Sequence, residues 1–267
     1  MAALTFIKWG GSLITDKATP YTVRTDVLER LADELARYWP ARDGGLVLGH
    51  GSGSFGHEAA RASGFAAAGD APPPAEAFSA VQHAAARLHR EVMAALRSAG
   101  LPAVSLVPSS SLLATDGQPT HVPTDILKHV LTQGALPVTY GDVLVDRTQG
   151  SSIASTETLF RALIPALRGA GHPTARALWF GDTDGLYDPT GATISTVAAA
   201  EAPELLKMIG APRGVDVTGG MAHRLQTVAA LAAEGVPSVL ANGQRAGALH
   251  RLLCGETRDP ATHITAP

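Results

Sequence analysis

Residues 45–57 read GLVLGHGSGSFGH, an apolar run followed by a glycine-rich turn. The apolar run predicts a buried strand, and the three glycines that follow His50 and precede His57 have the G-x-G-x-x-G spacing of a dinucleotide-binding loop. This interpretation requires the loop to lie in the first strand-to-helix turn, with an acidic residue at the end of the next strand about 20 residues later. Both requirements decide whether the chain has a nicotinamide or flavin fold.

Neither requirement is met. A separate glycine turn at Gly10-Gly11 comes first, and the acid at the required distance, Asp70, stands in AGDAPPP, which is no strand end. The G-x-x-x-x-G-K-[ST] pattern of a nucleotide-binding P-loop is also missing from the sequence. The sequence therefore argues against a dinucleotide oxidoreductase, and the glycines of 51–56 are interpreted as a loop for another phosphate.

Strand and helix patterns alternate along the rest of the chain. Predicted strands span 4–9, 45–50, 102–108, 135–145, 175–180 and 236–243, and predicted helices span 24–39, 74–100, 156–171, 219–235 and 246–255. This alternation predicts an α/β fold with a largely parallel sheet that is covered on both faces. We interpret 1–267 as a single domain, and a shift toward Gly, Pro and Thr near 169–174 as a division between two lobes, 1–170 and 171–267. The stretch 66–74 is predicted to be a surface loop.

Composition excludes several classes of protein. A net charge of −3 lacks the basic excess needed to bind nucleic acid or an anionic membrane. The apolar run before Lys8 is too short for a signal peptide, and no later stretch approaches the length of a membrane span. The single cysteine, Cys254, excludes an internal disulfide and a cysteine-based zinc cluster. We therefore expect a cytoplasmic protein with no nucleic-acid or membrane partner.

Four loops rich in glycine or aspartate follow predicted strands: KWGGS, HGSGSFGH, YGD and GDTDGLYD. In a parallel sheet such loops gather at the carboxyl edge, where ligands bind. Glycine turns that enter helices present backbone N–H groups to anions, assisted by the helix dipole. Lys8 and Lys17, two of only four lysines among 21 basic residues, flank the first turn. Two glycine turns and two lysines predict a cradle for a phosphate chain, and phosphoryl transfer needs little more than such positioned cations and amides.

Five stretches together resemble the ordered motifs of the amino-acid kinase superfamily: IKWGGSLITDK (7–17), HGSGSFGH (50–57), LPVTYGDVL (136–144), GDTDGLYD (181–188) and DVTGGMAHRL (216–225). The match runs from residue 6 to about 245. Within the superfamily, GSFGH is similar to the isopentenyl phosphate kinase branch, which acts in isoprenoid biosynthesis by alternative mevalonate pathways.

The resemblance implies both a fold and an activity. The fold is an open αβα sandwich with a mostly parallel central sheet, usually a homodimer, in which 1–170 holds the phosphate acceptor and 171–267 holds Mg-ATP. The activity is the ATP- and Mg²⁺-dependent phosphorylation of isopentenyl phosphate to isopentenyl diphosphate by direct in-line transfer. Besides Mg-ATP, the resemblance implies a small-molecule phosphate acceptor as partner, and the residues that would hold the metal are not identified.

On the nucleotide side, the resemblance implies that Lys8 and the turn after it hold the ATP β- and γ-phosphates, and that Lys17 stabilises the transferring group. The ATP-binding residues implied are Lys8, Gly10, Gly11, Ser12, Gly53, Asp182, Tyr187, Gly220 and Arg224.

On the acceptor side, the resemblance implies that Ser52 and Gly53 present amides to the acceptor, that His57 hydrogen-bonds its phosphate, and that Gly141 and Asp142 line the same cleft. A phosphate monoester brings its own ionised oxygen, so no general base is required. His57 is then a charge and hydrogen-bond partner that positions the acceptor. The alternative interpretation is that His57 only caps a helix. Lys8, Lys17 and His57 are the predicted catalytic residues.

The sequence departs from the superfamily pattern at three places. Arg224 stands where TGGM-x-x-K has lysine, STET (155–158) stands where SGDD is usual, and Gly181 replaces the threonine of TDVDG. Glu157 is the one carboxylate left in STET, and we assign it a supporting role that orients lysines or magnesium.

Other functions remain open. A related kinase could act on another phosphate or phosphonate, as a fosfomycin kinase does, because the acceptor-tail contacts cannot be located in the sequence. A non-catalytic nucleotide-binding regulator with the same fold would account for STET and Arg224.

Overall fold

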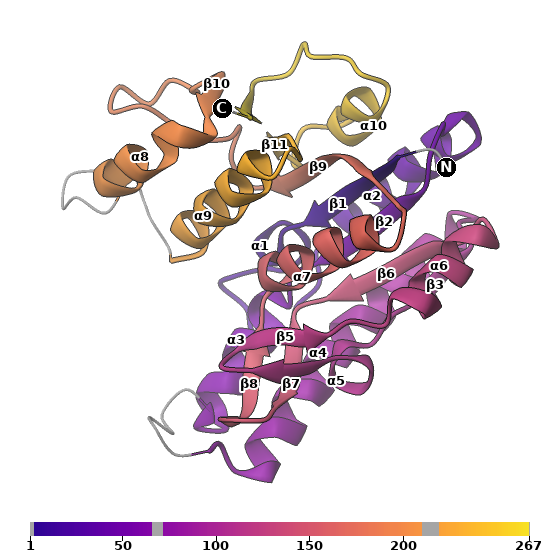
Figure 1. Cartoon of the computed structure of the whole chain (residues 1–267), viewed down its shortest axis with the longest axis vertical. Helices are drawn as coiled ribbons and strands as arrows, with labels where there is room; N and C mark the ends of the chain where they lie inside the picture. The colour runs from indigo at the N-terminus through magenta and orange to yellow at the C-terminus, as the bar shows by residue number, and fades with distance from the viewer. Residues whose placement is uncertain (1–2, 66–71, 210–218, 267) are drawn as a thin grey trace.

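The computed structural model describes residues 3–65, 72–209 and 219–266 (Figure 1). The N-terminal half contains β1 (Leu4–Trp9), α1 (Gly11–Ile14), α2 (Thr25–Tyr38), the 3-10 helix η1 (Trp39–Ala41), β2 (Leu46–His50), α3 (Gly53–Ala62), α4 (Ala75–Ser98), β3 (Ala103–Ser105), α5 (Pro108–Ser111), β4 (Leu113–Thr115), β5 (Gln118–His121) and α6 (Thr124–Thr132). The remainder contains β6 (Leu136–Tyr140), β7 (Asp142–Asp146), β8 (Gly150–Ala154), α7 (Thr156–Gly169), β9 (Thr174–Gly181), β10 (Thr196–Ala198), η3 (Ala199–Glu201), α8 (Ala202–Ile209), α9 (Gly219–Ala233), β11 (Ser238–Asn242), α10 (Ala248–Leu253) and β12 (Ala261–Thr265).

The central sheet has eight strands in the order β10-β12-β11-β9-β1-β2-β6-β3. All neighbouring pairs are parallel except β11 and β12, which are antiparallel. The prediction of an α/β fold with a mostly parallel sheet is therefore confirmed. Because β9 of the C-terminal part pairs with β1 of the N-terminal part, one continuous sheet joins the two predicted lobes.

Helices cover both faces of this sheet, and alternation along β1 decides which residues face which side. Ile7 and Trp9 belong to a hydrophobic cluster with residues of α2, α3, α4 and α10. Leu4 and Phe6 belong to a second cluster with residues of α7 and α9, the two helices that lie over the sheet in Figure 1. Lys8 has the same parity as Leu4 and Phe6, so the lysine side chain is buried beneath α7 and α9 rather than exposed to solvent.

The predicted strand 135–145 was wrong as a single element. It divides at Gly141 into β6, in the central sheet, and β7, in a second sheet of order β5-β4-β7-β8. The apolar run continues across the division, so hydrophobicity alone does not mark it. Of the predicted surface loop 66–74, residues 66–71 lie outside the described ranges. None of the helices within the described ranges is long and apolar enough to cross a membrane.

The two glycine turns touch one another at the carboxyl edge of the central sheet. β1 and β2 pair as neighbours with Trp9 opposite His50, so the turns that follow them start side by side. A Cβ atom added to Gly11 would lie 2.6 Å from the Cα of Gly53, and one added to Gly51 would lie 2.6 Å from the nitrogen of Gly11. Real Cβ atoms do not approach backbone this closely, so glycine is required for the contact.

We predict that Gly11→Ala lowers the free energy of unfolding by about 1–3 kcal/mol, because the added methyl group overpacks a backbone contact that cannot relax cheaply. Urea denaturation checks this. Gly169→Ala is the matched control, since a Cβ there meets no atom within 4 Å and alanine favours the helix by up to about 1 kcal/mol. Equal effects of the two substitutions would contradict the importance of the contact.

Candidate active site

Unpaired backbone amides line the two glycine turns. α1 begins at Gly11 and α3 begins at Gly53, and the first N–H groups of a helix have no partner inside it. The amide nitrogens of Gly11, Ser12, Ser52 and Gly53 donate no hydrogen bond to another described residue. Two adjacent pairs of free donors at helix starts form a site suited to anions such as phosphates.

Thr15 fastens the two turns together. Its hydroxyl donates to the carbonyl of Gly11 (2.8 Å) and accepts from the amide of Ser54 (3.0 Å). The amide of Gly51 also donates to the carbonyl of Trp9 (3.0 Å). Thr15 could not be recognised in the sequence, because a lone threonine after a strand has no distinctive spacing.

Lys8, Glu157 and Arg224 form a charged cluster that joins three elements. Lys8 lies on β1, Glu157 in the first turn of α7, and Arg224 on α9. The ammonium of Lys8 pairs with the carboxylate of Glu157, and the Nε of Arg224 lies 3.3 Å from the same carboxylate oxygen. Lys8 is 4% exposed and Glu157 5% exposed. Two cations share one anion, so the cluster keeps one net positive charge beneath the first glycine turn.

Burial and charge shift the ionisation of this cluster. Burial lowers the pKa of Lys8, Glu157 raises it in part, and the nearby charge of Arg224 also lowers it; the net pKa is about 8 instead of the ordinary 10.5. Burial raises the pKa of Glu157, but the charges of Lys8 and Arg224 more than offset this effect and leave the pKa lowered, at about 2. Glu157 is thus ionised at neutral pH and keeps the buried ammonium of Lys8 protonated.

All four residues of the STET stretch have a structural task. The Ser155 hydroxyl caps α7 by accepting from the amide of Thr158 (3.1 Å), and the Thr156 hydroxyl donates to the carbonyl of His50 (2.6 Å). Glu157, the next residue, pairs with Lys8. The stretch therefore ties the start of α7 to the end of β2 and to β1.

Arg224 extends toward the first glycine turn. A Cβ atom added to Gly181 would lie 2.9 Å from Nη1 of Arg224, and one added to Gly10 would lie 3.8 Å from Nη2. Gly10 is held in place by its own amide, which donates to the carbonyl of Phe180 (2.7 Å). The guanidinium thus contacts Glu157 through one nitrogen and reaches the Gly10–Gly181 region with the other two.

Lys17 and Asp182, which come from segments far apart in the sequence, form an ion pair. Lys17 follows α1 and is exposed, and its ammonium is 3.6 Å from a carboxylate oxygen of Asp182, which follows β9. The other oxygen of Asp182 accepts from the side-chain amide of Gln244 (3.4 Å). The structure therefore brings together Lys17 and Asp182, two residues predicted to act on the nucleotide side.

Tyr187 and Gly220 are less closely tied to this cluster. The hydroxyl of Tyr187 accepts from the amide of Asp184 (3.0 Å), and the carboxylate of Asp184 is held by Arg245 (2.7 Å). Tyr187 is thus engaged within its own turn. Gly220 lies in the first turn of α9, as predicted, and the residues just before this helix lie outside the described ranges.

The acceptor-side residues differ in their surroundings. His57 lies exposed on α3 and has no hydrogen-bond partner among the described residues. A Cβ atom added to Gly141 would lie 3.4 Å from the amide nitrogen of Ser52, so Gly141 lies against the second glycine turn. Asp142 is buried and accepts from the amide of Ser109 (3.1 Å), which turns one of its oxygens toward α5. Burial raises its pKa, and its other oxygen has no partner among the described residues.

The described ranges contain no group of three or more His, Cys, Asp or Glu side chains arranged to hold a metal ion. Glu157, the carboxylate predicted to orient lysines or magnesium, is already occupied by Lys8 and Arg224. A divalent cation at this site would therefore need oxygens other than those of Glu157.

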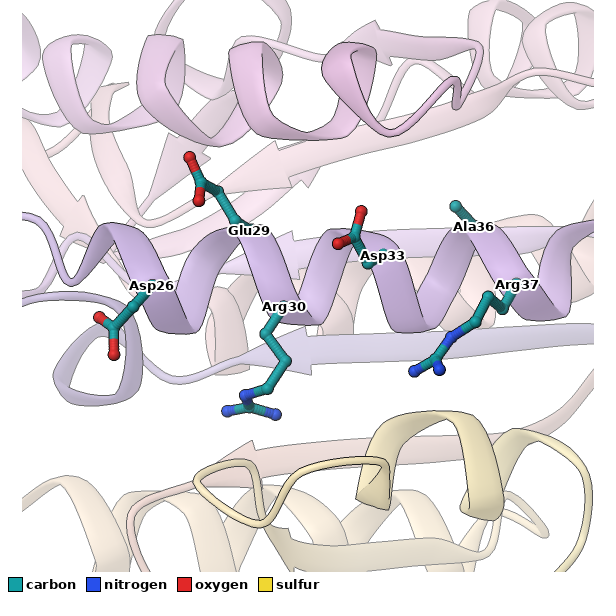
Figure 2. A pocket seen from close by; sticks show the side chains of 6 residues that line it. All are labelled: Asp26, Glu29, Arg30, Asp33, Ala36 and Arg37. Atoms are coloured by element: carbon teal, nitrogen blue, oxygen red, sulfur yellow. The ribbon is translucent and has the colours of Figure 1, made fainter.

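A hollow of about 760 Å³ lies elsewhere, over the outer face of α2. Figure 2 shows the six side chains that line it, with Arg30 and Arg37 directed to one side of the helix and Glu29 and Asp33 to the other. Arg30 is already engaged by Glu34 (2.9 Å) and by the carbonyl of Gly243 (2.6 Å). None of the residues of the glycine turns or of the charged cluster contributes to this hollow.

The sequence and the fold both match known proteins. The Amino acid kinase family matches residues 3–242. An isopentenyl phosphate kinase of Methanothermobacter thermautotrophicus is 30% identical over 94% of this chain and 95% of its own length. An isopentenyl phosphate kinase of Methanocaldococcus jannaschii is 28% identical over 95% of this chain and 96% of its own length.

Solved structures agree with these matches. An X-ray structure of isopentenyl phosphate kinase superimposes with a TM-score of 0.79 at 28% identity and covers 98% of this chain and 100% of the other. N-acetylglutamate synthase from Neisseria gonorrhoeae, at 18% identity and a TM-score of 0.71, shares the fold over 98% of this chain and 59% of its own. The chain therefore belongs to the amino acid kinase family and, within that family, to the group of isopentenyl phosphate kinases.

Proposed function

We propose that this protein transfers the γ-phosphoryl group of ATP to isopentenyl phosphate and so forms isopentenyl diphosphate and ADP. The observation that supports this best is the meeting of two glycine turns, each with two free amides, above the Lys8–Glu157–Arg224 cluster. One turn suits the nucleotide phosphates and the other suits the phosphate of the acceptor. The relatives named isopentenyl phosphate kinase support the choice of acceptor.

In the proposed reaction, the residues on the nucleotide side stabilise the phosphate chain and the transferring group. An oxygen of the acceptor phosphate attacks the γ-phosphorus, and the bond from that phosphorus to the β–γ bridging oxygen breaks, which releases ADP. Lys8 and Arg224 offset negative charge on the nucleotide phosphates, with Glu157 orienting both cations. Lys17 is exposed and carries its ammonium on a flexible four-carbon stem, so it suits the moving phosphoryl group.

On the acceptor side, the amides of Ser52 and Gly53 would bind the phosphate of isopentenyl phosphate, and His57 would position it and offset repulsion between two anions. Gly141 leaves room beside the Ser52 amide. The role of Asp142 stays a prediction: one of its carboxylate oxygens accepts from Ser109, and the other has no partner among the described residues.

Mg²⁺ fits this site as a companion of ATP. It prefers oxygen ligands and is often held by substrate phosphates, waters and one or two carboxylates. When bound, it would supply positive charge that neutralises charge developing on the phosphate groups. Asp182 is the candidate carboxylate on the nucleotide side, since Glu157 is occupied by two cations.

Several further expectations belong to this proposal. The N-terminal lobe, 1–170, would bind the acceptor and form the contact of a homodimer, and the C-terminal lobe, 171–267, would bind the nucleotide. A cytoplasmic location and a place in a mevalonate-type route to isoprenoids are consistent with the substrate. Sedimentation of the purified protein would test the dimer.

Two alternatives share the fold. A kinase for another phosphate or phosphonate, similar to a fosfomycin kinase, would use the same nucleotide side and differ beyond His57. A non-catalytic nucleotide-binding regulator finds less support, because the unusual STET stretch and Arg224 make ordered contacts with Lys8 and with the end of β2.

We predict turnover with isopentenyl phosphate in a coupled assay of ADP release, and a His57→Ala variant whose kcat/KM for this acceptor falls by about 10- to 150-fold. This range corresponds to one lost hydrogen bond to a charged group, about 1.5–3 kcal/mol. The KM for ATP should stay close to the wild-type value. His83→Ala, which removes an exposed histidine of α4, is the control. Turnover of a phosphonate but not of isopentenyl phosphate would contradict the proposed acceptor.

We predict that Lys17→Ala lowers kcat by about 100-fold or more while the dissociation constant for ATP changes little, because this lysine acts on the group in transit. Rate measurements and calorimetric titration with ATP separate the two effects. Lys128→Ala, which removes a lysine of α6 that pairs with Asp125, is the control. If the wild-type protein binds ATP but shows no turnover, the protein is the non-catalytic regulator and not a kinase.

We predict that Glu157→Gln moves the alkaline limb of the pH profile to lower pH. Lys8 must be protonated to bind phosphate, and activity is lost as pH rises through its pKa of about 8. Removing the Glu157 charge removes the interaction that raises this pKa, so the ammonium loses its proton at lower pH. The profile of kcat/KM for ATP, which reports the free enzyme, is the measurement. An unchanged alkaline limb would mean that Glu157 does not control the charge of Lys8.

A further inference from the structure

Two buried histidines stand behind the second glycine turn and have no part in the mechanism above. His50 ends β2 and is fully buried, and His89 on α4 is 5% exposed. Their rings stack with that of Tyr140, at centroid distances of 5.5 Å for His50 and 4.1 Å for His89. Burying two ionisable rings here requires compensating hydrogen bonds, because a buried polar ring is costly unless its nitrogens are hydrogen-bonded.

The rings form one continuous chain of hydrogen bonds that ends on the glycine turn. Nδ1 of His50 lies 3.1 Å from the carbonyl oxygen of Gly51, and Nε2 of His50 lies 3.0 Å from Nδ1 of His89. Nε2 of His89 lies 2.6 Å from the hydroxyl of Ser105 on β3. Every ring nitrogen of the pair therefore has a partner.

For two neutral rings, only one arrangement of protons satisfies all three contacts. A carbonyl oxygen can only accept, so Nδ1 of His50 donates and its Nε2 accepts. Nδ1 of His89 must then donate to His50, and its Nε2 accepts from the hydroxyl of Ser105. Burial lowers the pKa of His50 to about 4 and that of His89 to about 3, so both rings are neutral at neutral pH.

The end of this chain fixes the peptide unit between Gly51 and Ser52. Its carbonyl is held on the side of the buried rings by His50. In a trans peptide the N–H points away from the carbonyl, so the Ser52 amide is directed away from the histidines. This amide has no partner among the described residues and lies against Gly141. The backbone carbonyl of His50 is fixed as well, because it accepts from the Gly141 amide (2.9 Å) and the Thr156 hydroxyl (2.6 Å).

We propose that His89 and His50 form a positioning unit that sets the direction of the Ser52 amide, one of the donors for the acceptor phosphate. This inference rests on the proposed function, in which Ser52 binds the phosphate of isopentenyl phosphate. His89 acts through His50, and His50 acts through the carbonyl of Gly51. Neither ring touches the substrate, so their effect is on acceptor binding and not on the nucleotide.

Atom-matched variants of His89 test the direction of the chain. In His89→Asn the side-chain NH₂ can replace Nδ1 as the hydrogen-bond donor to His50. In His89→Gln the longer side chain places its amide near Ser105 instead, where Nε2 lies in the wild type. His89→Leu keeps neither the donor to His50 nor the acceptor for Ser105. We expect Asn to leave the KM for isopentenyl phosphate within about threefold of wild type. Gln and Leu should raise it about tenfold, the effect of one net hydrogen bond, with the KM for ATP unchanged.

Thermal unfolding of each variant identifies those that fail to fold. An equal rise in the KM for isopentenyl phosphate in the Asn and Gln variants would overturn the proposal, and so would equal changes in the KM values for ATP and the acceptor. The two histidines would then contribute only to packing.

The proton arrangement gives a second test that does not depend on the substrate. In ¹⁵N-histidine NMR spectra of the whole protein, we expect two rings in the neutral form with the proton on Nδ1, and neither should titrate between pH 5.5 and 8. A proton on Nε2 of either ring, or titration in that range, would overturn the proposal. Failure of the proposed function would give a different result. The wild-type protein would then show these NMR signals but would not turn over isopentenyl phosphate.

Discussion

The contact between the two glycine turns is the constraint on which the site depends. β1 and β2 are parallel neighbours, and the turns after them would collide if either carried side chains at Gly11, Gly51 or Gly53. Glycine lets the backbones meet, and Thr15 then joins them with two hydrogen bonds. As a result the free amides of both helix starts lie close together. A site that holds two phosphates close enough to react needs this proximity more than it needs any single side chain.

Charge is brought to the same region by the burial of Lys8. The alternation of β1 places this lysine on the face that α7 and α9 cover, where an unpaired ammonium would be very costly. Glu157 and Arg224, one from each helix, meet it there. The same three residues therefore satisfy two requirements. They pair the buried charges in the core, and they leave a net positive charge at the site. Breaking the cluster should affect stability and phosphate binding together, because removing one partner leaves a buried charge uncompensated.

Much of this arrangement could be predicted from the sequence, and the exceptions have physical causes. Long apolar runs marked the central strands, and glycine turns at their ends marked the site edge. The division of 135–145 at Gly141 was not predicted, because apolar residues continue into β7. The short strands β4 and β5 were missed, since three or four residues give no periodicity. Thr15 and the pairing of His50 with His89 depend on contacts between distant segments, which a sequence pattern does not contain.

The departures from the superfamily pattern are better explained as one coordinated change than as separate losses. An arginine has a planar fork of three nitrogens, whereas a lysine has one. Arg224 uses Nε for Glu157 and directs Nη1 and Nη2 toward Gly181 and Gly10. A threonine at 181 would place its Cβ 2.9 Å from Nη1, so the glycine there makes room for the guanidinium. The longer residue and the smaller one therefore belong together, and between them they keep a cation directed at the first phosphate turn. A protein that had abandoned phosphoryl transfer would have no need to preserve that charge in that place.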